Sequence, residues 1–398
     1  MKTHNTGYSA KLNMSNQGII YDAIVVGAGI EGSSTAYHLA KSGKKTLLLE
    51  QFPLPHSRGS SHGQSRITRK AYGPQEHYTI MMEESYRLTD VLESECGEQL
   101  FINCGCLAFG PKDHPFVSGA VEALSRHGAP HDVFNVEEQR RRYPYLALPS
   151  DFKVVLDKTG GLLRADKILQ AFQKQFQRFG GTLLDGEPML DLYPGDIVSI
   201  KTTKGVHRAR SVVLALGAWA AKFLPRIGVN VPLEPLKITV CYWEEKNGKH
   251  FSIENFPTFM SESGTGNNTI YGLPSEEYPG LVKICLHHGP AIDPDNRDGV
   301  DNQWVLDTIK MIVHTHFPTL EKEPRIVETC IYTNTPDKDF ILDLHPSWKN
   351  VVIAAGFSGH GFKLAPVVGK VLSQLATGQK PAYDMSHFKI DRFFKNKL

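Results

Sequence analysis

The segment from Tyr21 to Glu50 constrains the fold of this chain more than any other. An apolar run, Ala23–Val26, leads into a glycine-rich turn and then a helix-forming stretch. A second apolar run, Thr46–Leu49, ends at the acid Glu50. Strand, turn, helix, strand and acid in this order are typical of the β-α-β unit that binds a dinucleotide. The chain is therefore predicted to contain a nucleotide-binding α/β domain.

The glycines of this turn follow the pattern Gly27-x-Gly29-x-x-Gly32. Gly27 permits the tight turn, Gly29 lets the backbone approach a pyrophosphate, and Gly32 lets the helix pack close to the strand. The N-terminus of the helix then offers free N–H groups and a positive dipole to the phosphates.

Four further residues of this unit are predicted to bind the cofactor. Ile30 and Glu31 lie in the first helical turn, where the phosphates are expected. Glu50 ends the second strand, where its carboxylate can accept hydrogen bonds from a ribose, and Gln51 follows it.

Length and composition set the remaining bounds. A chain of 398 residues suits two domains, and 41% apolar with 22% charged residues is ordinary for a globular protein. The net charge of +2 favours neither nucleic acid nor an anionic membrane as a partner, and no apolar run has the length of a membrane span. We expect residues 1–19 to be a flexible leader without a secretory core, within which Met14 is an alternative start.

The cysteines predict neither a disulfide framework nor a metal site. The spacing of Cys104-Gly105-Cys106 is wrong for a zinc knuckle, and no second pair exists. For five of the six cysteines we expect buried, reduced thiols.

Periodicity predicts alternating helices and strands after the first unit. The predicted helices are Tyr78–Cys96, Ala165–Arg178, Trp304–His316 and Ala365–Leu375. The predicted strands are Phe101–Gly110, Val154–Leu156, Thr182–Leu184, Val206–Trp219 (ending in a turn that contains Gly217), Ile238–Trp243, Thr269–Leu273, Val282–Leu286 and Val351–Ala355.

Nucleotide-binding signals occur at both ends of the chain, and the antiparallel-looking strands lie between them. This arrangement favours FAD over NAD, because the nucleotide domain of an NAD dehydrogenase is usually one contiguous block. The predicted fold is α/β (α+β overall): a Rossmann-type FAD-binding domain of the glutathione-reductase/D-amino-acid-oxidase-like kind, interleaved with a substrate domain on a mainly antiparallel sheet. The FAD-binding domain is predicted at residues 20–90, 150–232 and 325–385, the substrate domain at 91–149 and 233–324, and a C-terminal tail at 386–398.

Five segments together resemble one family. They are Leu48–Gly73 (LLEQFPLPHSRGSSHGQSRITRKAYG), Tyr271–Pro274 (YGLP), Gly280–Gly289 (GLVKICLHHG), Cys330–Asp343 (CIYTNTPDKDFILD) and Ala354–Pro366 (AAGFSGHGFKLAP). They resemble the monomeric sarcosine oxidase family of flavin amine oxidases, and within it the animal sarcosine oxidase and L-pipecolate oxidase branch. The resemblance covers nearly the whole chain after the leader.

The resemblance implies a covalent flavin. The cysteine that matches Cys330 carries FAD in this family through a thioether to the 8α-methyl carbon; from the sequence alone, a buried thiol on a strand would be favoured. The resemblance also places His62 and Arg66 against the flavin ring, with Ser61 in the same cofactor-binding loop. Gly359 and Gly361 belong to the glycine-rich turn that suits a site closing over the isoalloxazine.

The resemblance further implies a clamp for the substrate carboxylate made by Arg69 and Lys363, the latter counted with the cofactor residues as well. The spacing Arg66-x-x-Arg69 can put both guanidiniums on one side of a helical turn. A solvated basic face is the alternative, but the interleaved serines and glycine of this loop favour a ligand.

Lys283 and His287 are four residues apart on an apolar stretch, so that in a strand they would share a face. The resemblance places Lys283 near flavin N5, where dioxygen is reduced, and His287 near the substrate amine. Tyr271 and Tyr332 match aromatic residues on the substrate side. The alternatives are a lysine on the solvent face of an edge strand and tyrosines that only pack.

The resemblance predicts oxidation of a secondary amino acid such as sarcosine or L-pipecolate to an imine, with reduction of O2 to H2O2. No Asp or Glu stands out as a general base. The alternatives are a dehydrogenase that uses a carrier protein, an oxidase for a different N-substituted amino acid, and a non-catalytic flavoprotein. The terminal Asn396-Lys397-Leu398 resembles a peroxisomal address, which predicts a peroxisomal import receptor as a partner; otherwise we expect a cytoplasmic protein, and in either case a monomer.

Overall fold

The structure is a computed structural model, and it describes residues 18–73, 75–246, 248–262 and 269–394. The expected leader, apart from its last two residues, and the tripeptide Asn396-Lys397-Leu398 lie outside the described residues.

The first sheet has the strand order β10-β11-β12-β1-β2-β9, with β19 beside β12 and β18 beside β19. β1, β2, β9, β12 and β19 pair in parallel, and the other strands join them antiparallel. The strands are β1 (Ile20–Val26), β2 (Thr46–Leu49), β9 (Thr182–Leu184), β10 (Met189–Tyr193), β11 (Val198–Thr202), β12 (Val206–Leu214), β18 (Ile341–Leu344) and β19 (Val351–Ala355).

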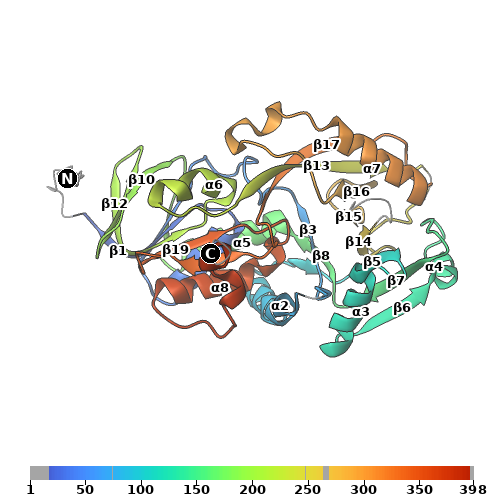
Figure 1. Ribbon diagram of the computed structural model, residues 1–398, viewed down its shortest axis with the longest axis horizontal. Helices are drawn as coiled ribbons and strands as arrows, with labels where there is room; N and C mark the ends of the chain where they lie inside the picture. The colour runs from blue at the N-terminus through green and yellow to red at the C-terminus, as the bar shows by residue number, and fades with distance from the viewer. Residues whose placement is uncertain (1–17, 74, 247, 263–268, 395–398) are drawn as a thin grey trace, which may run out of the picture.

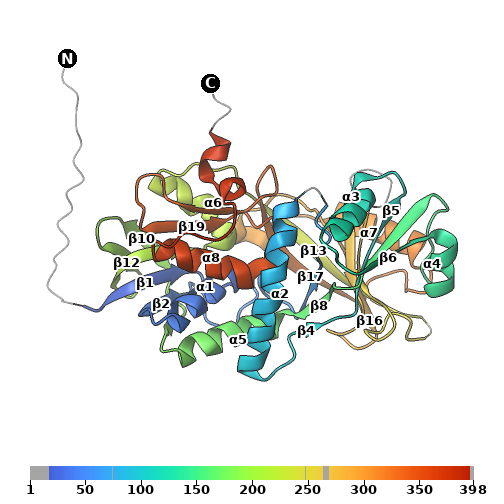
Figure 2. The same cartoon turned by 90° about the horizontal axis from the view of Figure 1, so that it is seen from below.

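Both faces of this sheet are covered, which explains why its central strands are continuous apolar runs. On one face, Val25, Leu48 and Val352 pack against helices α1, α2, α5 and α8, which lie together on that side in Figure 2. On the other face, Ile24 and Leu47 pack against α6 and the short helix η2. The helices are α1 (Ile30–Lys41), α2 (Glu76–Cys96), α5 (Ala165–Arg178), α6 (Ala220–Phe223), α8 (Ala365–Ala376) and η2 (Leu224–Ile227).

The second sheet has the order β17-β13-β16-β15-β14-β5-β7-β6, and its pairs are antiparallel except β14 with β5. It occupies the other half of the molecule with α3, α4 and α7 (Figure 1). The strands are β5 (Cys106–Pro111), β6 (His131–Asn135), β7 (Phe152–Asp157), β13 (Glu234–Glu244), β14 (Thr258–Glu262), β15 (Thr269–Leu273), β16 (Leu281–Leu286) and β17 (Ile326–Asn334). The helices are α3 (Pro115–Arg126), α4 (Val136–Arg142) and α7 (Gln303–His316).

Side chains of β16 alternate between two environments. Val282, Ile284 and Leu286 pack into the core under α7. Lys283 therefore points to the opposite face of the sheet, because successive strand residues alternate in direction. That face turns toward the first sheet and forms part of the cavity described below.

A third, three-stranded sheet connects the two halves in the order β3-β8-β4. Its strands are β3 (Ser65–Thr68), β8 (Gly161–Arg164) and β4 (Phe101–Ile102). The remaining short helices are η1 (Gly217–Trp219), η3 (Pro294–Gly299), η4 (Phe362–Leu364), η5 (Ser386–Phe388) and η6 (Ile390–Phe393).

Two predictions about local structure are wrong. The segment with Arg66 is the strand β3, and Arg69 follows it, so the two arginines do not share a helical turn. The predicted strand Phe101–Gly110 is two strands, β4 and β5, separated by a turn in which Gly105 has φ of +80°. In Val206–Trp219, the strand ends at Leu214 and the turn with Gly217 follows as a 3-10 helix, as predicted.

The sheets also divide the chain differently from the expected domain boundaries. β7 and β17 were assigned to the FAD-binding domain by residue number, but both are strands of the second sheet. β17 pairs with β13 along its whole length, so Cys330 reaches the cavity from the second sheet.

All six cysteines are free thiols. Cys96 and Cys104 are half-buried rather than buried, in contrast to the other four. Among the described residues, no helix is long and apolar enough to cross a membrane.

Candidate active site

A cavity of about 1180 Å³ extends from the edge of the first sheet to the inner face of the second. Gly27, Glu50, Ala215 and Gly356 line it, and each directly follows a parallel strand of the first sheet. In open α/β sheets, ligands bind in the crevice outside the carboxyl ends of such strands. Every residue that the sequence predicts for the site lines this one cavity.

The glycine turn is shaped by contacts that exclude a side chain. A Cβ on Gly27, whose φ is +101°, would lie 2.3 Å from Ala215 O, and a Cβ on Gly32 would lie 1.8 Å from Gly27 O. A Cβ on Gly29 would meet only the Ser61 hydroxyl, at 3.1 Å. Gly29 therefore makes no close contact with the protein backbone, and it leaves open space in the cavity.

The acid at the end of β2 is fixed by the backbone. The Glu50 carboxylate accepts from Ala28 N at 2.8 Å and from Phe52 N at 3.1 Å. Gln51 and Gly217 line the cavity beside it. The N–H of Ile30, in the first turn of α1, donates to Ser61 Oγ at 3.0 Å.

Arg66, His62 and Cys330 form a compact group at the middle of the cavity. The Arg66 guanidinium donates to Ser60 O at 2.9 Å and to His62 O at 2.6 Å, and it lies 4.0 Å from Cys330 Sγ. The ring nitrogens of His62 lie 2.7 Å from Gly59 O and 2.9 Å from Thr329 O. Burial and the Arg66 charge lower the pKa of His62, and the two carbonyl groups oppose this shift.

Arg69 and Lys363 are cations that lack a carboxylate. Neither makes an ion pair with any described residue. Arg69 Nε instead lies 3.1 Å from Met260 Sδ, and Lys363 Nζ donates to His360 O at 3.1 Å. Both charges lie near the Tyr72 ring, at 4.6 and 5.4 Å from its centroid. Burial and the Arg69 charge hold the pKa of Lys363 well below its usual value, and an anion bound here would oppose this shift and favour the charged ammonium.

Lys283 is also buried, but it has a counter-ion. Its Nζ lies 3.1 Å from Glu277 Oε2, with side-chain exposures of only 6% and 4% for the two residues. Tyr242 Oη donates to Glu277 at 2.5 Å, and Gln64 N donates at 2.7 Å. Burial raises the pKa of Glu277, but the Lys283 charge and the Tyr242 hydrogen bond outweigh it and hold that pKa below its usual value. β16 is a central strand, so the alternative of a lysine on an edge strand is wrong.

The sequence reasoning missed Glu277. The available signal was the cost of burying a lysine, which requires a nearby acid. Two acids, Glu276 and Glu277, precede Lys283 in the same hairpin.

His287, Tyr271 and Tyr332 also line the cavity. His287 Nδ1 lies 3.2 Å from Tyr332 Oη. Burial, with the nearby Lys363 and Arg69 charges, lowers the pKa of His287 to about 3, so the imidazole is neutral. Burial raises the pKa of both Tyr271 and Tyr332, so both phenols keep their protons. A Cβ on Gly359, whose φ is +78°, would lie 2.5 Å from the Tyr332 ring.

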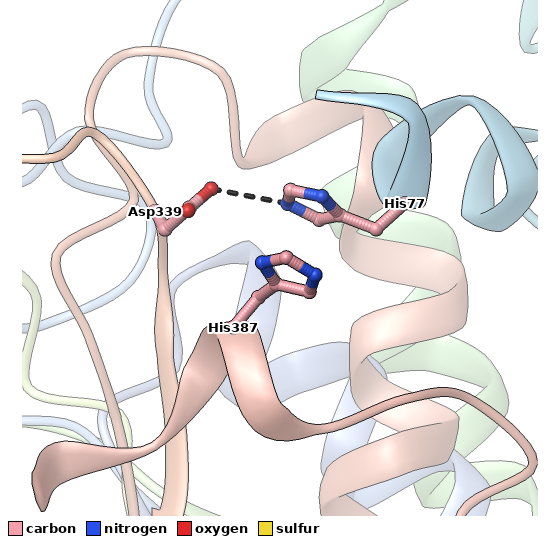
Figure 3. Close-up of side chains that lie close together, drawn as sticks. All are labelled: His77, Asp339 and His387. Atoms are coloured by element: carbon pink, nitrogen blue, oxygen red, sulfur yellow. Dashed lines mark hydrogen bonds and ion pairs between the residues drawn. The ribbon is translucent and has the colours of Figure 1, made fainter. Parts of the chain in front are cut away.

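One cluster of metal-ligating residue types, His77, Asp339 and His387, lies outside the cavity lining (Figure 3). His77 Nε2 lies 3.1 Å from Asp339 Oδ1, and the two imidazoles stack at 4.2 Å with an angle of 7° between their planes. A metal ion cannot lie in two parallel ring planes at once, so the stacked geometry does not form a metal site. The stacked imidazoles instead pack the C-terminal η5 against the start of α2.

Comparison with known proteins identifies the family. The model of the FAD dependent oxidoreductase family matches residues 22–375. The chain belongs to this family. It is 47% identical over 384 residues to peroxisomal sarcosine oxidase of Mus musculus, covering 96% of this chain and 98% of that protein. It is 37% identical over 377 residues to monomeric sarcosine oxidase of Bacillus sp. (strain NS-129), covering 94% and 97%. The solved structure of NikD, described as an unusual amino acid oxidase essential for nikkomycin biosynthesis, superposes with a TM-score of 0.83 at 26% identity over 94% of this chain and 98% of that chain.

The residues present fit FAD, the cofactor of this family. The glycine contacts leave room for a pyrophosphate where the helix dipole of α1 is positive. Glu50 lies where a ribose is expected, and the cavity continues past this end to Lys283 of the second sheet and to Arg69 and Lys363.

Proposed function

We propose that this oxidoreductase oxidises small secondary amino acids, such as sarcosine, L-pipecolate or related N-alkyl and cyclic amino acids. The substrate would lose one hydrogen from the nitrogen and one from the adjacent carbon to give an imine, and O2 would take up both as H2O2. One observation carries the proposal: half-buried Arg69 and buried Lys363 have no acidic partner among the described residues, in the cavity of an FAD-dependent enzyme. A substrate carboxylate is the anion that such a pair would bind.

FAD, when bound, supplies the two-electron chemistry that connects amine oxidation to reduction of dioxygen. Gly27, Gly29, Gly32 and the N-terminus of α1 would hold its pyrophosphate, and Glu50 its ribose. The Cys330 thiol would form a thioether to the flavin 8α-methyl carbon, as the resemblance implies; the S–H bond and one methyl C–H bond would be broken, and the two electrons would pass through the flavin to O2. The Arg66 guanidinium lies 4.0 Å from the Cys330 sulfur.

Residues from several elements around the cavity would position the substrate. Arg69 and Lys363 would fix its carboxylate, and neutral His287 with Tyr332 would face its amine. Because the pKa of His287 is near 3, this imidazole is a weak base and acts by hydrogen bonding. The substrate amine would then have to enter in its neutral form.

Lys283 would serve the reaction with dioxygen. Transfer of an electron to neutral O2 creates a negative charge, and a fixed ammonium beside it stabilises that charge selectively. A carrier-dependent dehydrogenase would have no use for such a cation, and peroxide yield in air distinguishes the two. A non-catalytic flavoprotein remains the third alternative, but buried charges stabilise a fold poorly and therefore need another reason to be present.

The deciding experiment is an anaerobic screen of flavin bleaching with sarcosine, L-pipecolate, L-proline and larger N-alkyl amino acids. At least one should bleach the flavin, and admitting air should restore the colour with one H2O2 per turnover. Amines without a carboxylate should be poor substrates. The absence of bleaching by every amine would refute the proposal, and bleaching without peroxide in air would favour the dehydrogenase.

We also propose that the enzyme is a monomer and works in the peroxisome, where the peroxide it makes would be contained. The relatives support both points, as they include a peroxisomal sarcosine oxidase and a monomeric sarcosine oxidase. The import signal would be Asn396-Lys397-Leu398. A fluorescent protein with this tail should give puncta in animal cells and become diffuse without Leu398. Diffuse fluorescence with the intact tail would favour the cytoplasm.

A further inference from the structure

Glu31 and Glu50 are buried acids that line the cofactor end of the cavity, and they differ in their partners. Glu50 accepts from two backbone N–H groups. Glu31 is only 7% exposed, and neither of its carboxyl oxygens has a hydrogen-bond partner. A buried polar group without a partner is costly, and its presence beside a ligand cavity indicates that the ligand supplies the partner.

Glu31 lies between two glycine-rich turns from opposite ends of the chain. It belongs to the first turn of α1, directly after the Gly27–Gly29 turn where a pyrophosphate is expected. Its Oε1 lies 2.9 Å from the position that a Cβ of Gly361 would occupy, in the turn before α8. The second turn is the one expected to close over the flavin ring. In FAD, the hydroxyl-bearing ribityl chain connects the pyrophosphate to that ring.

The surroundings of Glu31 favour its neutral form. Burial raises the pKa of Glu31 well above its usual value of 4.5, and no charged group offsets this shift. The titratable groups on α1 and on the elements packed against it include His38, Asp166 in α5, Lys363 in η4 and Lys370 in α8, which pairs with Glu84. A bound pyrophosphate would add negative charge nearby and disfavour ionisation further.

We propose that Glu31 binds FAD as a neutral carboxylic acid whose O–H donates a hydrogen bond to a ribityl hydroxyl oxygen. A protonated carboxyl offers one O–H donor and one carbonyl acceptor, and a ribityl hydroxyl can pair with both. The ionised form would lack the donor and would repel the pyrophosphate. The inference rests on FAD binding, which family membership supplies, and it does not depend on which amine is oxidised.

The test measures FAD affinity rather than turnover. Variants are made in a Cys330→Ala background, so that flavin is not fixed covalently, and the flavin-free protein is titrated with FAD by fluorescence quenching between pH 6 and pH 9. Glu31→Gln keeps the shape, a donor and an acceptor, and should bind FAD within about threefold of the parent. Glu31→Ala loses the hydrogen bond and should bind about tenfold more weakly. Parent affinity should fall toward high pH, where Glu31 ionises, and Glu31→Gln should remove this dependence.

Glu50→Gln is the matched control, because it makes the same isosteric change in an acid whose two oxygens both accept from backbone N–H groups. It should weaken FAD binding, because an amide nitrogen cannot accept. The thermal stability of the flavin-free proteins reports any purely structural role. The proposal is overturned if Glu31→Gln binds FAD as weakly as Glu31→Ala, if Glu31→Ala binds like the parent, or if Glu31→Gln keeps the pH dependence. Failure of the amine screen would leave these results unchanged, so the two proposals fail separately.

Discussion

Replacing Lys283 by Met tests the buried ion pair and the oxygen chemistry together. Met keeps the length of the side chain and removes its charge, which leaves Glu277 as a buried acid at 4% exposure. Breaking a buried pair from one side costs about 3–5 kcal/mol in general. Glu277 retains its hydrogen bonds from Tyr242 and Gln64, so we expect the lower end of that range, about 3 kcal/mol. At about 2 °C per kcal/mol for a chain of this size, the melting temperature should fall by roughly 6 °C at neutral pH.

The pH dependence of this loss has a definite sign. In the parent, the pKa of Glu277 is below its usual value of 4.5, so its contribution to stability is present above that pH and lost as the pH falls through the lowered pKa. In Lys283→Met the isolated carboxyl is easier to protonate. The stability gap between the two proteins should therefore narrow as the pH is lowered from neutral toward 5.

The double variant Lys283→Met/Glu277→Gln separates stability from reactivity. It removes the stranded charge and should recover most of the lost melting temperature. Its reduced form should still react slowly with dioxygen, because a missing term of about 3 kcal/mol is roughly a hundredfold in rate. Flavin reduction by substrate without oxygen should change far less in both variants.

Differential scanning fluorimetry and stopped-flow measurement of the two half-reactions check these results. Lys370→Met is the matched control, since Lys370 pairs with Glu84 at 2.6 Å but with 38% and 19% exposure. Loss of such a surface pair should cost under about 1 kcal/mol. An unchanged melting temperature in Lys283→Met, or no rescue in the double variant, would refute the reasoning about the pair. Restored oxygen reactivity in the double variant would show that Lys283 does not activate dioxygen.

Three further changes address the rest of the cavity. Arg69→Ala should raise the apparent substrate constant by about tenfold or more, because a charge-assisted hydrogen bond is lost; an unchanged constant in steady-state kinetics would exclude the clamp. Cys330→Ala should fold and bind FAD but release all of its yellow colour on acid precipitation, whereas the parent should keep it in the pellet; parent flavin found only in the supernatant would exclude the thioether. Gly359→Ala should weaken substrate binding because its methyl group would lie 2.5 Å from the Tyr332 ring, and an unaltered substrate titration would contradict that.

Sequence patterns predict those helices and strands whose bounds are set by neighbouring residues in the chain. The helix Ala165–Arg178 and the strand Thr182–Leu184 have the predicted bounds, because an amphipathic period and a following pair of glycines define them. The strand with Arg66 was mistaken for a helical turn, since its conformation is set by pairing with β8, about a hundred residues later in the chain. The placement of β17 in the second sheet likewise depends on pairing with β13, which no local pattern encodes.

For the candidate site, too, contacts between distant segments could not be predicted from the sequence. Motifs and resemblance bring every predicted residue to one cavity, because the glycine turns and flanking strands fix where the chain returns. They do not reveal which buried charges are compensated. Glu277 looks like a turn residue in the sequence, and its burial comes from the distant loop of Gly63 and Gln64 that packs on it.

Whether a cation in the cavity has an acidic partner bears on the role proposed for it. Arg69 and Lys363 lack an acid among the described residues, which is costly unless the ligand brings a permanent negative charge, as an amino acid carboxylate does. Lys283 has Glu277, so its charge is tolerated while the cavity holds only neutral partners. Dioxygen is neutral when it enters and becomes charged only on reduction. A buried cation that stabilises a charge formed only during the reaction needs a permanent counter-ion from the protein. A buried cation that binds the carboxylate of the substrate does not need one, because the substrate is the counter-ion. The two arrangements therefore agree with a carboxylate site at Arg69 and Lys363 and an oxygen site at Lys283, and they would be hard to explain if the roles were exchanged.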